Sequence, residues 1–287
     1  MKIGIIGAES SHSHSYCKTI NIDNLFPDFE ISHIWGETKD LAENCSKKFN
    51  VPTIATNQED MIGEIDALIV VHKNGKYNLK AATKFIDSNI PIFIDKPFCT
   101  NVKETNEFIT LCNEYETVFT SFGVQPLQKD FLSIKKDIET SSKIFELATY
   151  GYANFDDPNG GIFFYGFHQL SLILDLLGNN VNSVETLQAD QNIKIFLYNS
   201  TKKIASINIM PEEWKSVGFY LHYANEKGYH SHKLVYDDHI YLPGIEKFLK
   251  MFTTKQKPYT DEEILAPIAI LEAIEKSYIS SQKMNVY

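Results

Sequence analysis

Residues 2–12 of the chain are KIGIIGAESSH, an apolar run that ends at a glycine and gives way to polar residues. The apolar part, Lys2–Ile6, predicts a short buried strand, and Gly7 allows a sharp turn after it. A short helix is expected next, with Tyr16 and Cys17 on its inner side. A strand, a tight turn and a helix in this order begin a parallel α/β sheet.

The same pattern repeats through residues 1–122. Short apolar runs predict further strands at Glu30–Trp35, Asp66–Val71, Ile90–Ile94 and Val118–Val124. Amphipathic stretches predict helices at Lys39–Phe49, Leu79–Ile86 and Asn101–Tyr115. Apolar runs without alternation suit a parallel sheet that is covered on both faces. The order therefore predicts a doubly wound parallel sheet, a dinucleotide-binding Rossmann domain, over residues 1–122.

Residues 123–287 show a different pattern, in which the predicted strands follow one another closely, and this spacing favours antiparallel pairing. The predicted strands are Ile144–Tyr152, Val184–Ala189, Ile193–Tyr198, Ile204–Met210, Val217–Ala224 and Lys233–Tyr236. The predicted helices are Phe167–Leu177, Ile245–Phe252 and Asp261–Ser280. We expect an α+β substrate domain with an open, mostly antiparallel sheet. Helices on one side of such a sheet leave an apolar face, so we also expect a homo-oligomer, a dimer or a tetramer.

The composition narrows the possible partners and the compartment. The 287-residue chain has a formal net charge of −10, and an acidic surface repels nucleic acid and anionic membranes. No stretch approaches the ~20 apolar residues that a membrane span needs. The four cysteines show no CxxC spacing, and the start lacks the pattern of a signal peptide. We therefore expect a cytoplasmic protein that binds neither nucleic acid nor membranes.

The turn after the first strand is where a Rossmann domain holds a dinucleotide pyrophosphate, commonly with the pattern GxGxxG. If Gly7 is the first glycine, Glu9 and His12 replace the second and third. A carboxylate ~4 Å from a phosphate would cost about 4 kcal/mol at an effective dielectric of 20, so Glu9 must point away, bind a hydroxyl group or mark a lost cofactor. Ser10, Ser11 and His12 could supply replacement donors. The candidate cofactor-binding residues of this turn are Gly7, Ala8, Glu9, Ser10, Ser11 and His12.

An acidic residue at the end of the second strand commonly binds the adenosine ribose. Glu37 stands at that place, after Trp35 and Gly36. It would favour NAD over NADP, although either cofactor is considered. The alternative is a solvated loop glutamate.

Two histidine pairs have spacings that metal sites also use. His12 and His14 would lie on different faces of a helix, without a cysteine or acidic residue at ligand spacing. His230 and His232 have strand-like spacing, but they follow Gly228 closely and are expected in an exposed turn. We therefore expect no metal ligands.

A charged motif, Asp95-Lys96-Pro97-Phe98, follows the predicted strand Ile90–Ile94. Ligands of parallel sheets bind at the carboxyl ends of the strands. A lysine there, beside an acid and followed by proline, is well placed to contact a substrate oxygen. The alternative is a surface lysine in a loop.

This motif resembles the Glu-Lys-Pro motif of the glucose-fructose oxidoreductase / inositol dehydrogenase / MocA (Gfo/Idh/MocA) superfamily. The resemblance covers most of the chain, including Asp66–Val71, the segment from Gly160 to His168, and Phe248–Val286. It implies a Rossmann domain followed by an open-sheet domain. It also implies hydride transfer between NAD or NADP and a sugar, polyol or related hydroxy compound.

The resemblance also implies catalytic roles. Lys96 would contact the reacting hydroxyl, His168 would be the acid/base, and His72 and Asp95 would join the cofactor-binding residues. His168 falls at the start of the predicted helix Phe167–Leu177, where the helix dipole disfavours the imidazolium and leaves a ring that can accept a proton. We expect Lys96 and His168 to face a common cleft. The alternative for His168 is a helix-capping or core histidine.

The chain departs from the family pattern near His168. Phe164 stands where the family has an Asp, and Ser171 where it has an acid. Tyr165 is a third candidate catalytic residue, because its hydroxyl could donate a hydrogen bond beside the missing Asp. The usual histidine after the fourth strand falls at Tyr77. These changes leave two alternatives open: a catalytically altered or non-redox nucleotide- or sugar-binding regulatory protein, and a reaction that uses bound NAD transiently.

Overall fold

The computed structural model describes residues 1–199 and 204–286. The chain forms two compact units. The first comprises Met1–Cys99, Lys103–Phe122 and Tyr241–Ile264, and the second comprises Thr100–Val102, Gly123–Ile240 and Leu265–Tyr287. The division expected from the sequence, after residue 122, assigned residues 241–264 to the second half, whereas here they belong to the first unit.

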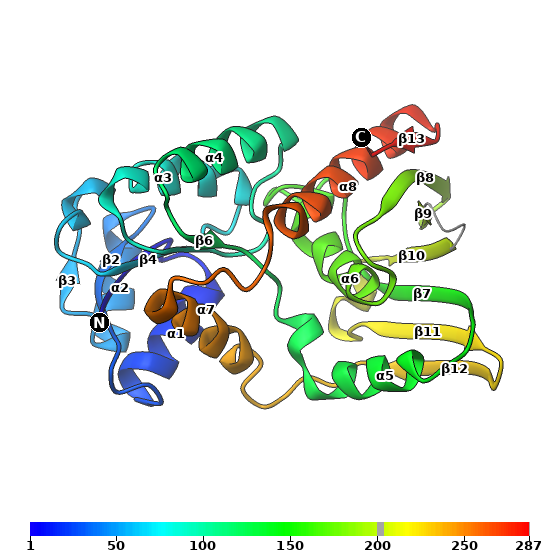
Figure 1. The fold of residues 1–287 in the computed structure, drawn as a ribbon, viewed down its shortest axis with the longest axis horizontal. Coiled ribbons are helices and arrows are strands. Elements are labelled where there is room, and N and C mark those ends of the chain that lie inside the picture. The colour runs from blue at the N-terminus through cyan, green and yellow to red at the C-terminus, as the bar shows by residue number, and fades with distance from the viewer. Residues whose placement is uncertain (200–203, 287) are drawn as a thin grey trace. The chain divides into compact units, whose positions relative to one another are not determined.

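The first unit is built on a six-stranded sheet with the order β3-β2-β1-β4-β5-β6 (Figure 1), and its strands pair in parallel. The strands are β1 (Lys2–Ile6), β2 (Glu30–Trp35), β3 (Thr53–Ile54), β4 (Ala67–Val70), β5 (Ile92–Ile94) and β6 (Phe119–Thr120). β1 and β4 lie side by side although β2 and β3 come between them in the sequence. Ligands of doubly wound sheets bind beside such a reversal of strand order, at the carboxyl ends of the strands.

Helices cover both faces of this sheet, which confirms the predicted doubly wound fold. α3 and α4 lie on one face, and α1 and α7 lie on the other (Figure 1). The helices are α1 (Ser11–Cys17), α2 (Lys39–Phe49), α3 (Asn78–Thr83), α4 (Val102–Glu114) and α7 (Leu242–Thr254). Phe93 of β5 stacks on Phe248 of α7 with ring centroids 4.5 Å apart, and Phe119 of β6 packs against Phe108 of α4 at 5.4 Å. Aromatic contacts thus join helices to both faces of the sheet.

The second unit is built on a seven-stranded sheet with the order β12-β11-β7-β10-β9-β8-β13. The strands are β7 (Ile144–Tyr152), β8 (Val181–Ala189), β9 (Asn192–Asn199), β10 (Ile204–Met210), β11 (Tyr220–Asn225), β12 (Gly228–Lys233) and β13 (Met284–Asn285). β7 and β10 pair in parallel, and the other described neighbours are antiparallel. This arrangement confirms the predicted mostly antiparallel sheet. The other helices are α5 (Lys129–Glu139), α6 (Ile162–Leu177) and α8 (Asp261–Ser280).

The prediction for the start of α6 is wrong. The helix begins at Ile162, directly after Gly161, and not at Phe167. The aromatic run after Gly161 is already helical, with Ile162, Phe163, Gly166 and Phe167 buried at helical spacing. His168 is therefore the seventh residue of the helix and lies beyond its first turn. Because the dipole acts mainly within the first turn, the dipole argument for a neutral imidazole does not apply.

The prediction of an exposed turn at His230 and His232 is also wrong. Both residues lie in β12, and their rings stack on Tyr223 of β11 with centroid distances of 4.5 and 5.8 Å. Helix α5 was not predicted at all. Within residues 1–199 and 204–286, no helix combines the length and the apolar character needed to cross a membrane.

Candidate functional site

The turn between β1 and α1 depends on a glycine and a serine cap. Gly7 has φ +118°, and an added Cβ would lie 2.6 Å from the carbonyl oxygen of Val71. Only glycine fits such a position. Ser10 caps α1, because its hydroxyl accepts a hydrogen bond from the His12 amide at 3.2 Å. Two of the six residues predicted for this turn, Gly7 and Ser10, thus determine its shape.

Both the main chain and the side chain of Glu9 contact residues outside the turn. Its amide donates to Glu37 Oε2 at 2.9 Å, and its carboxylate lies 3.7 Å from the Lys73 ammonium. Of the outcomes that the sequence left open, the structure has Glu9 directed to a lysine. That lysine reduces the repulsion that a phosphate near this turn would meet.

Glu37 offers an unused acceptor at the end of β2. Its Oε2 accepts the Glu9 amide, while its Oε1 is buried and accepts no hydrogen bond from the described residues. Burial raises the pKa of Glu37, and the backbone amides of Glu37, Glu9 and Ala8 oppose this shift. A buried acceptor without a donor is costly, so this oxygen suits a ligand hydroxyl.

A cavity of about 560 Å³ opens beside Glu37, and its lining includes Trp35, His72 and Tyr77. The His72 ring lies 6.0 Å from the Trp35 ring and 6.1 Å from the Tyr77 ring, centroid to centroid. Burial lowers the pKa of His72, while the hydrogen bond to Asn78 opposes this shift. The volume and the aromatic lining suit one flat, partly polar ligand group.

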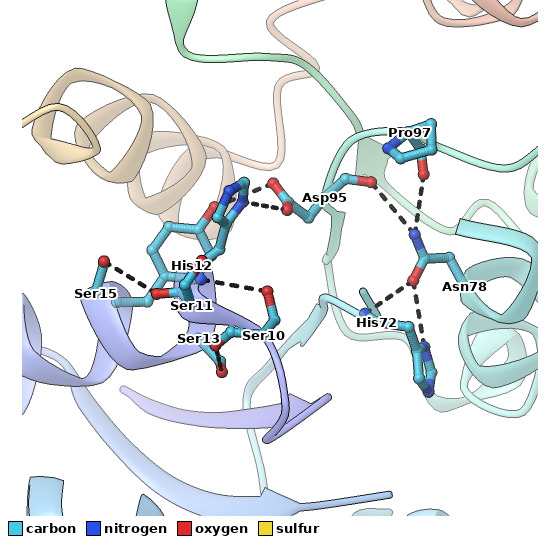
Figure 2. A network of polar contacts seen from close by, with 10 residues as sticks. Ser10, Ser11, His12, Ser13, Ser15, His72, Asn78, Asp95 and Pro97 are labelled. Carbon is cyan, nitrogen blue, oxygen red and sulfur yellow. Dashed lines mark hydrogen bonds and ion pairs between the residues drawn. The ribbon is translucent and has the colours of Figure 1, made fainter. Parts of the chain in front are cut away.

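Asp95 and Lys96 follow β5, and both are buried, with 4% and 7% of their surface exposed. Figure 2 shows that both oxygens of Asp95 face α1: His12 Nδ1 lies 2.6 Å from Oδ2, and the Tyr16 hydroxyl donates to Oδ1 at 3.1 Å. Burial alone would raise the pKa of Asp95, but His12, Lys96 and Tyr16 hold it below its ordinary value. Burial lowers the pKa of Lys96, and the Asp95 carboxylate opposes this shift. The pair therefore places a carboxylate and an amine together in a dry environment.

Asn78, at the start of α3, connects the residues that follow β4 and β5 (Figure 2). Its Oδ1 accepts the His72 amide at 3.1 Å and lies 3.2 Å from His72 Nδ1. Its Nδ2 donates to the carbonyl oxygens of Pro97 at 3.0 Å and of Asp95 at 3.4 Å. The sequence analysis missed Asn78, and also the role of Tyr16; an i, i+4 spacing from His12 is the one signal that could have revealed Tyr16.

In the second unit, His168 is 8% exposed and lies within a group of aromatic rings. Its ring centroid is 6.0 Å from that of Tyr165 and 5.8 Å from that of Phe219. Tyr165 also packs against Tyr152 at 5.0 Å, and the Lys215 ammonium lies 5.7 Å from the Tyr165 ring. These rings could stack on the face of a sugar-like ligand.

The sequence-predicted residues therefore fall into two groups. Those of the first unit gather around the carboxyl ends of β1, β2, β4 and β5; they are Gly7, Ala8, Glu9, Ser10, Ser11, His12, Glu37, His72, Asp95 and Lys96. Tyr165 and His168 belong to α6 of the second unit. No group of three or more metal-ligating side chains occurs among residues 1–199 and 204–286.

A family model described as an oxidoreductase family with an NAD-binding Rossmann fold, Gfo/Idh/MocA, matches residues 1–122. These residues belong to the Gfo/Idh/MocA oxidoreductase family. The match to an oxidoreductase family does not favour the non-redox alternative. No curated protein matches the chain.

Solved structures show the same fold along the whole chain. Scyllo-inositol dehydrogenase from Lactobacillus casei, with bound NAD(H) and scyllo-inositol, has a TM-score of 0.82 at 13% identity and covers 100% of this chain and 99% of its own. Myo-inositol 2-dehydrogenase from Lactobacillus plantarum has a TM-score of 0.82 at 15% identity, and the match covers 100% of this chain and 99% of that protein. An oxidoreductase from Agrobacterium radiobacter, in complex with NAD+, L-tartaric acid and magnesium, has a TM-score of 0.80 at 11% identity. The match covers 100% of this chain and 98% of that protein. At these identities the likeness shows that the chain shares their fold.

Proposed function

We propose that this protein is an NAD-dependent oxidoreductase that transfers a hydride between the nicotinamide and a sugar, polyol or related hydroxy compound. The observation that carries the proposal is the buried Lys96 next to Asp95 at the carboxyl end of β5, together with the unsatisfied Glu37 oxygen that follows β2 of the same sheet. An amine and an acceptor placed at the ends of parallel strands suit a substrate and a dinucleotide, respectively. The inositol dehydrogenases of similar fold suggest polyols as the first compounds to test.

The residues of the first unit fit a dinucleotide. The turn at Gly7 has no room for a side chain, the Glu37 oxygen can accept a ribose hydroxyl, and the cavity lined by Trp35, His72 and Tyr77 can hold a planar base. Glu9, paired with Lys73, does not present an unneutralised carboxylate to the phosphates. We propose these residues, with Ala8, Ser10 and Ser11, as the cofactor-binding set.

NAD suits this set better than NADP. A 2′-phosphate near Glu37 would bring two anions together, at a cost of about 4 kcal/mol for a separation of ~4 Å and an effective dielectric of 20. An arginine commonly binds the 2′-phosphate in NADP enzymes, and this chain contains no arginine. We therefore propose NAD as the cofactor.

The bound cofactor would supply the hydride acceptor or donor. In the oxidative direction we propose that His168 accepts the proton of the substrate hydroxyl while the carbinol carbon loses a hydride, which leaves a carbonyl group. The Lys96 ammonium stabilises the negative charge that develops on the substrate oxygen. The Asp95 carboxylate opposes the lowering of the Lys96 pKa by burial. Tyr165 is proposed to contact the substrate beside His168, as a hydrogen-bond donor.

The test is binding and turnover by the purified protein. NADH fluorescence should show binding, and absorbance at the nicotinamide wavelength should follow oxidation of scyllo-inositol, myo-inositol, glucose and tartrate. Lys96→Ala and His168→Ala should each abolish turnover and leave the far-ultraviolet circular dichroism unchanged. Full activity in both variants would refute the assigned roles, and the absence of NADH binding would refute the function.

We also propose that the protein is a cytoplasmic homo-oligomer with residues 1–122 as its cofactor domain. The cysteines support the compartment, since Cys17, Cys45, Cys99 and Cys112 are all buried and form no disulfide. Phe196 and His222 lie on the sheet face opposite the buried Thr186 and Leu221, and this face can contact a second copy. Light scattering should give a dimer or a tetramer, and a clean monomer would refute this part.

A further inference from the structure

Two helices, α3 and α1, contact the residues next to Lys96. The carbonyl oxygens of Asp95 and Pro97 both accept hydrogen bonds from Asn78. The side chain of Asp95 is held separately, by α1. The main chain around Lys96 and the neighbouring Asp95 carboxylate therefore depend on different partners.

The partners on α1 are His12 and Tyr16, which are four residues apart and so share one face of the helix. Their contacts to the two Asp95 oxygens measure 2.6 and 3.1 Å, and Asp95 is 4% exposed. Tyr241, at the start of α7, packs on His12 with ring centroids 4.8 Å apart. Tyr16 is 1% exposed and packs on Phe248 at 5.5 Å. Aromatic packing therefore holds both side chains in addition to their contacts with Asp95.

His12 occupies the place of the third glycine in the Rossmann pattern. A glycine there has no side chain that could reach Asp95, so the contact depends on the histidine and is not a requirement of the fold. From the sequence, His12 was expected to supply a donor to the cofactor. Its Nδ1 is instead used by Asp95, inside the first unit.

We propose that His12 and Tyr16 are positioning residues for Lys96, which they control by fixing the Asp95 carboxylate beside it. This inference rests on the proposed function, since it assigns a task within that reaction. His12 and Tyr16 hold the carboxylate, and the carboxylate holds the ammonium where the substrate oxygen gains charge. Tyr16, buried and without a second role in the proposed reaction, supplies the second anchor.

The charge balance of the cluster agrees with this role. A buried carboxylate without donors would take up a proton, and Asp95 would then no longer oppose the effect of burial on the Lys96 pKa. Two donors on Asp95 keep it ionised, and the pKa of Asp95 is accordingly below its ordinary value although burial acts in the other direction. The helix that follows the cofactor turn thus also acts, through Asp95, on the pKa of the lysine.

The test uses two variants that preserve different nitrogens of the histidine ring. In His12→Asn the amide nitrogen stands close to where Nδ1 was, so it can still donate to Asp95. In His12→Gln the amide nitrogen stands close to where Nε2 was, so the contact with Asp95 is lost. Tyr16→Phe removes the second donor. Ser15→Ala, on the same helix, is the control, because the Ser15 hydroxyl donates to the Ser11 carbonyl oxygen and not to Asp95.

Two readouts separate positioning from cofactor binding. The first is kcat, KM and the NADH dissociation constant for the best compound of the inositol panel. The second is amide hydrogen exchange over residues 92–98, measured without substrate or cofactor. The exchange measurement does not require turnover, so it decides the positioning role even if the panel shows that the proposed function is wrong.

We expect His12→Gln to lower kcat on the order of 100-fold, as small misplacements of a reacting group do, with NADH affinity changed by less than about twofold. Exchange over residues 92–98 should become faster in this variant. His12→Asn should stay within about threefold of the wild type in both readouts. Tyr16→Phe should lie between His12→Asn and His12→Gln, because it keeps the shorter of the two contacts to Asp95, that of His12. The inference is overturned if His12→Gln preserves kcat better than His12→Asn does. It is also overturned if His12→Gln weakens NADH binding and leaves kcat unchanged, or if amide exchange in His12→Gln matches the wild type.

Discussion

Asn78 and Pro97 are joined by a hydrogen bond of 3.0 Å from the Asn78 carboxamide to the Pro97 carbonyl oxygen, although 19 residues separate them in the sequence. The same carboxamide accepts the His72 amide at 3.1 Å, and Asn78 is fully buried. Gly75 packs against Pro97 so closely that an added Cβ would lie 2.5 Å from its ring. The segments that follow β4 and β5 are therefore coupled, and one of them carries Lys96.

Asn78→Ala should reduce both stability and turnover. The change leaves the buried His72 amide and the Pro97 carbonyl oxygen without partners, so we expect a loss of about 2–4 kcal/mol in the free energy of unfolding. Urea denaturation followed by circular dichroism measures this loss. Asn106→Ala, at an exposed position of α4, is the control and should change stability by less than about 0.5 kcal/mol. Equal stability of the two variants would show that the coupling is weak.

Glu37→Gln should weaken NADH binding and improve NADPH binding. The neutral amide keeps the size of the side chain but loses the charge-assisted hydrogen bond to a ribose hydroxyl, which is worth about tenfold in affinity. It also removes the repulsion of a 2′-phosphate. Fluorescence titration with both nucleotides measures the change, and Glu43→Gln on the exposed side of α2 is the control. A wild-type preference for NADPH would contradict the assignment of Glu37.

The sequence predicts the elements of this fold better than it predicts the contacts at the site. The strands Lys2–Ile6 and Glu30–Trp35 and the helix Lys39–Phe49 have the predicted bounds, because apolar spacing and capping residues are local signals. The start of α6 was misplaced, because aromatic residues are frequent in strands as well as in buried helices. The local pattern therefore could not distinguish a strand from a buried helix before Phe167.

The partners within the site depend on residues that are distant in the sequence. The motif around Lys96 was found because it follows a strand, and that location is a local feature. The contacts of Asp95 with Tyr16 span 79 residues, and the ion pair of Glu9 with Lys73 depends on the pairing of β1 with β4. Only the folded sheet brings such pairs together, so the sequence left the direction of Glu9 open.

Asp95→Asn should move the alkaline limb of the kcat/KM profile to lower pH. Burial lowers the pKa of Lys96 and the Asp95 carboxylate opposes this shift, so a neutral amide removes the opposing influence. Lys96 then loses its proton at a lower pH, and the reaction loses the ammonium that it needs. His12 and Tyr16 also face this cluster; burial and Asp95 raise the pKa of Tyr16 well above its ordinary value, so Tyr16 stays neutral.

The measurement is kcat/KM across the pH range in which the wild type remains folded, with Asp23→Asn as the control. Asp23 forms its ion pair with Lys18 on the surface, so its loss should leave the profile unchanged. An alkaline limb that stays in place while the acid limb moves to lower pH in Asp95→Asn would mean that the reaction needs neutral Lys96, and would contradict the proposed role of the ammonium.

Gly151→Ala should damage the region around His168 without affecting the cofactor. An added Cβ at Gly151 of β7 would lie 2.1 Å from the Phe219 ring, which packs against His168 at 5.8 Å. Phe219 must move, and overpacking of this kind costs about 1–3 kcal/mol. We expect lower stability and lower kcat with an unchanged NADH dissociation constant, because the proposed cofactor residues belong to the first unit. The double variant Gly151→Ala/Phe219→Leu should recover stability, since leucine leaves room for the methyl group; failure of this rescue would show that the clash with Phe219 is not the cause.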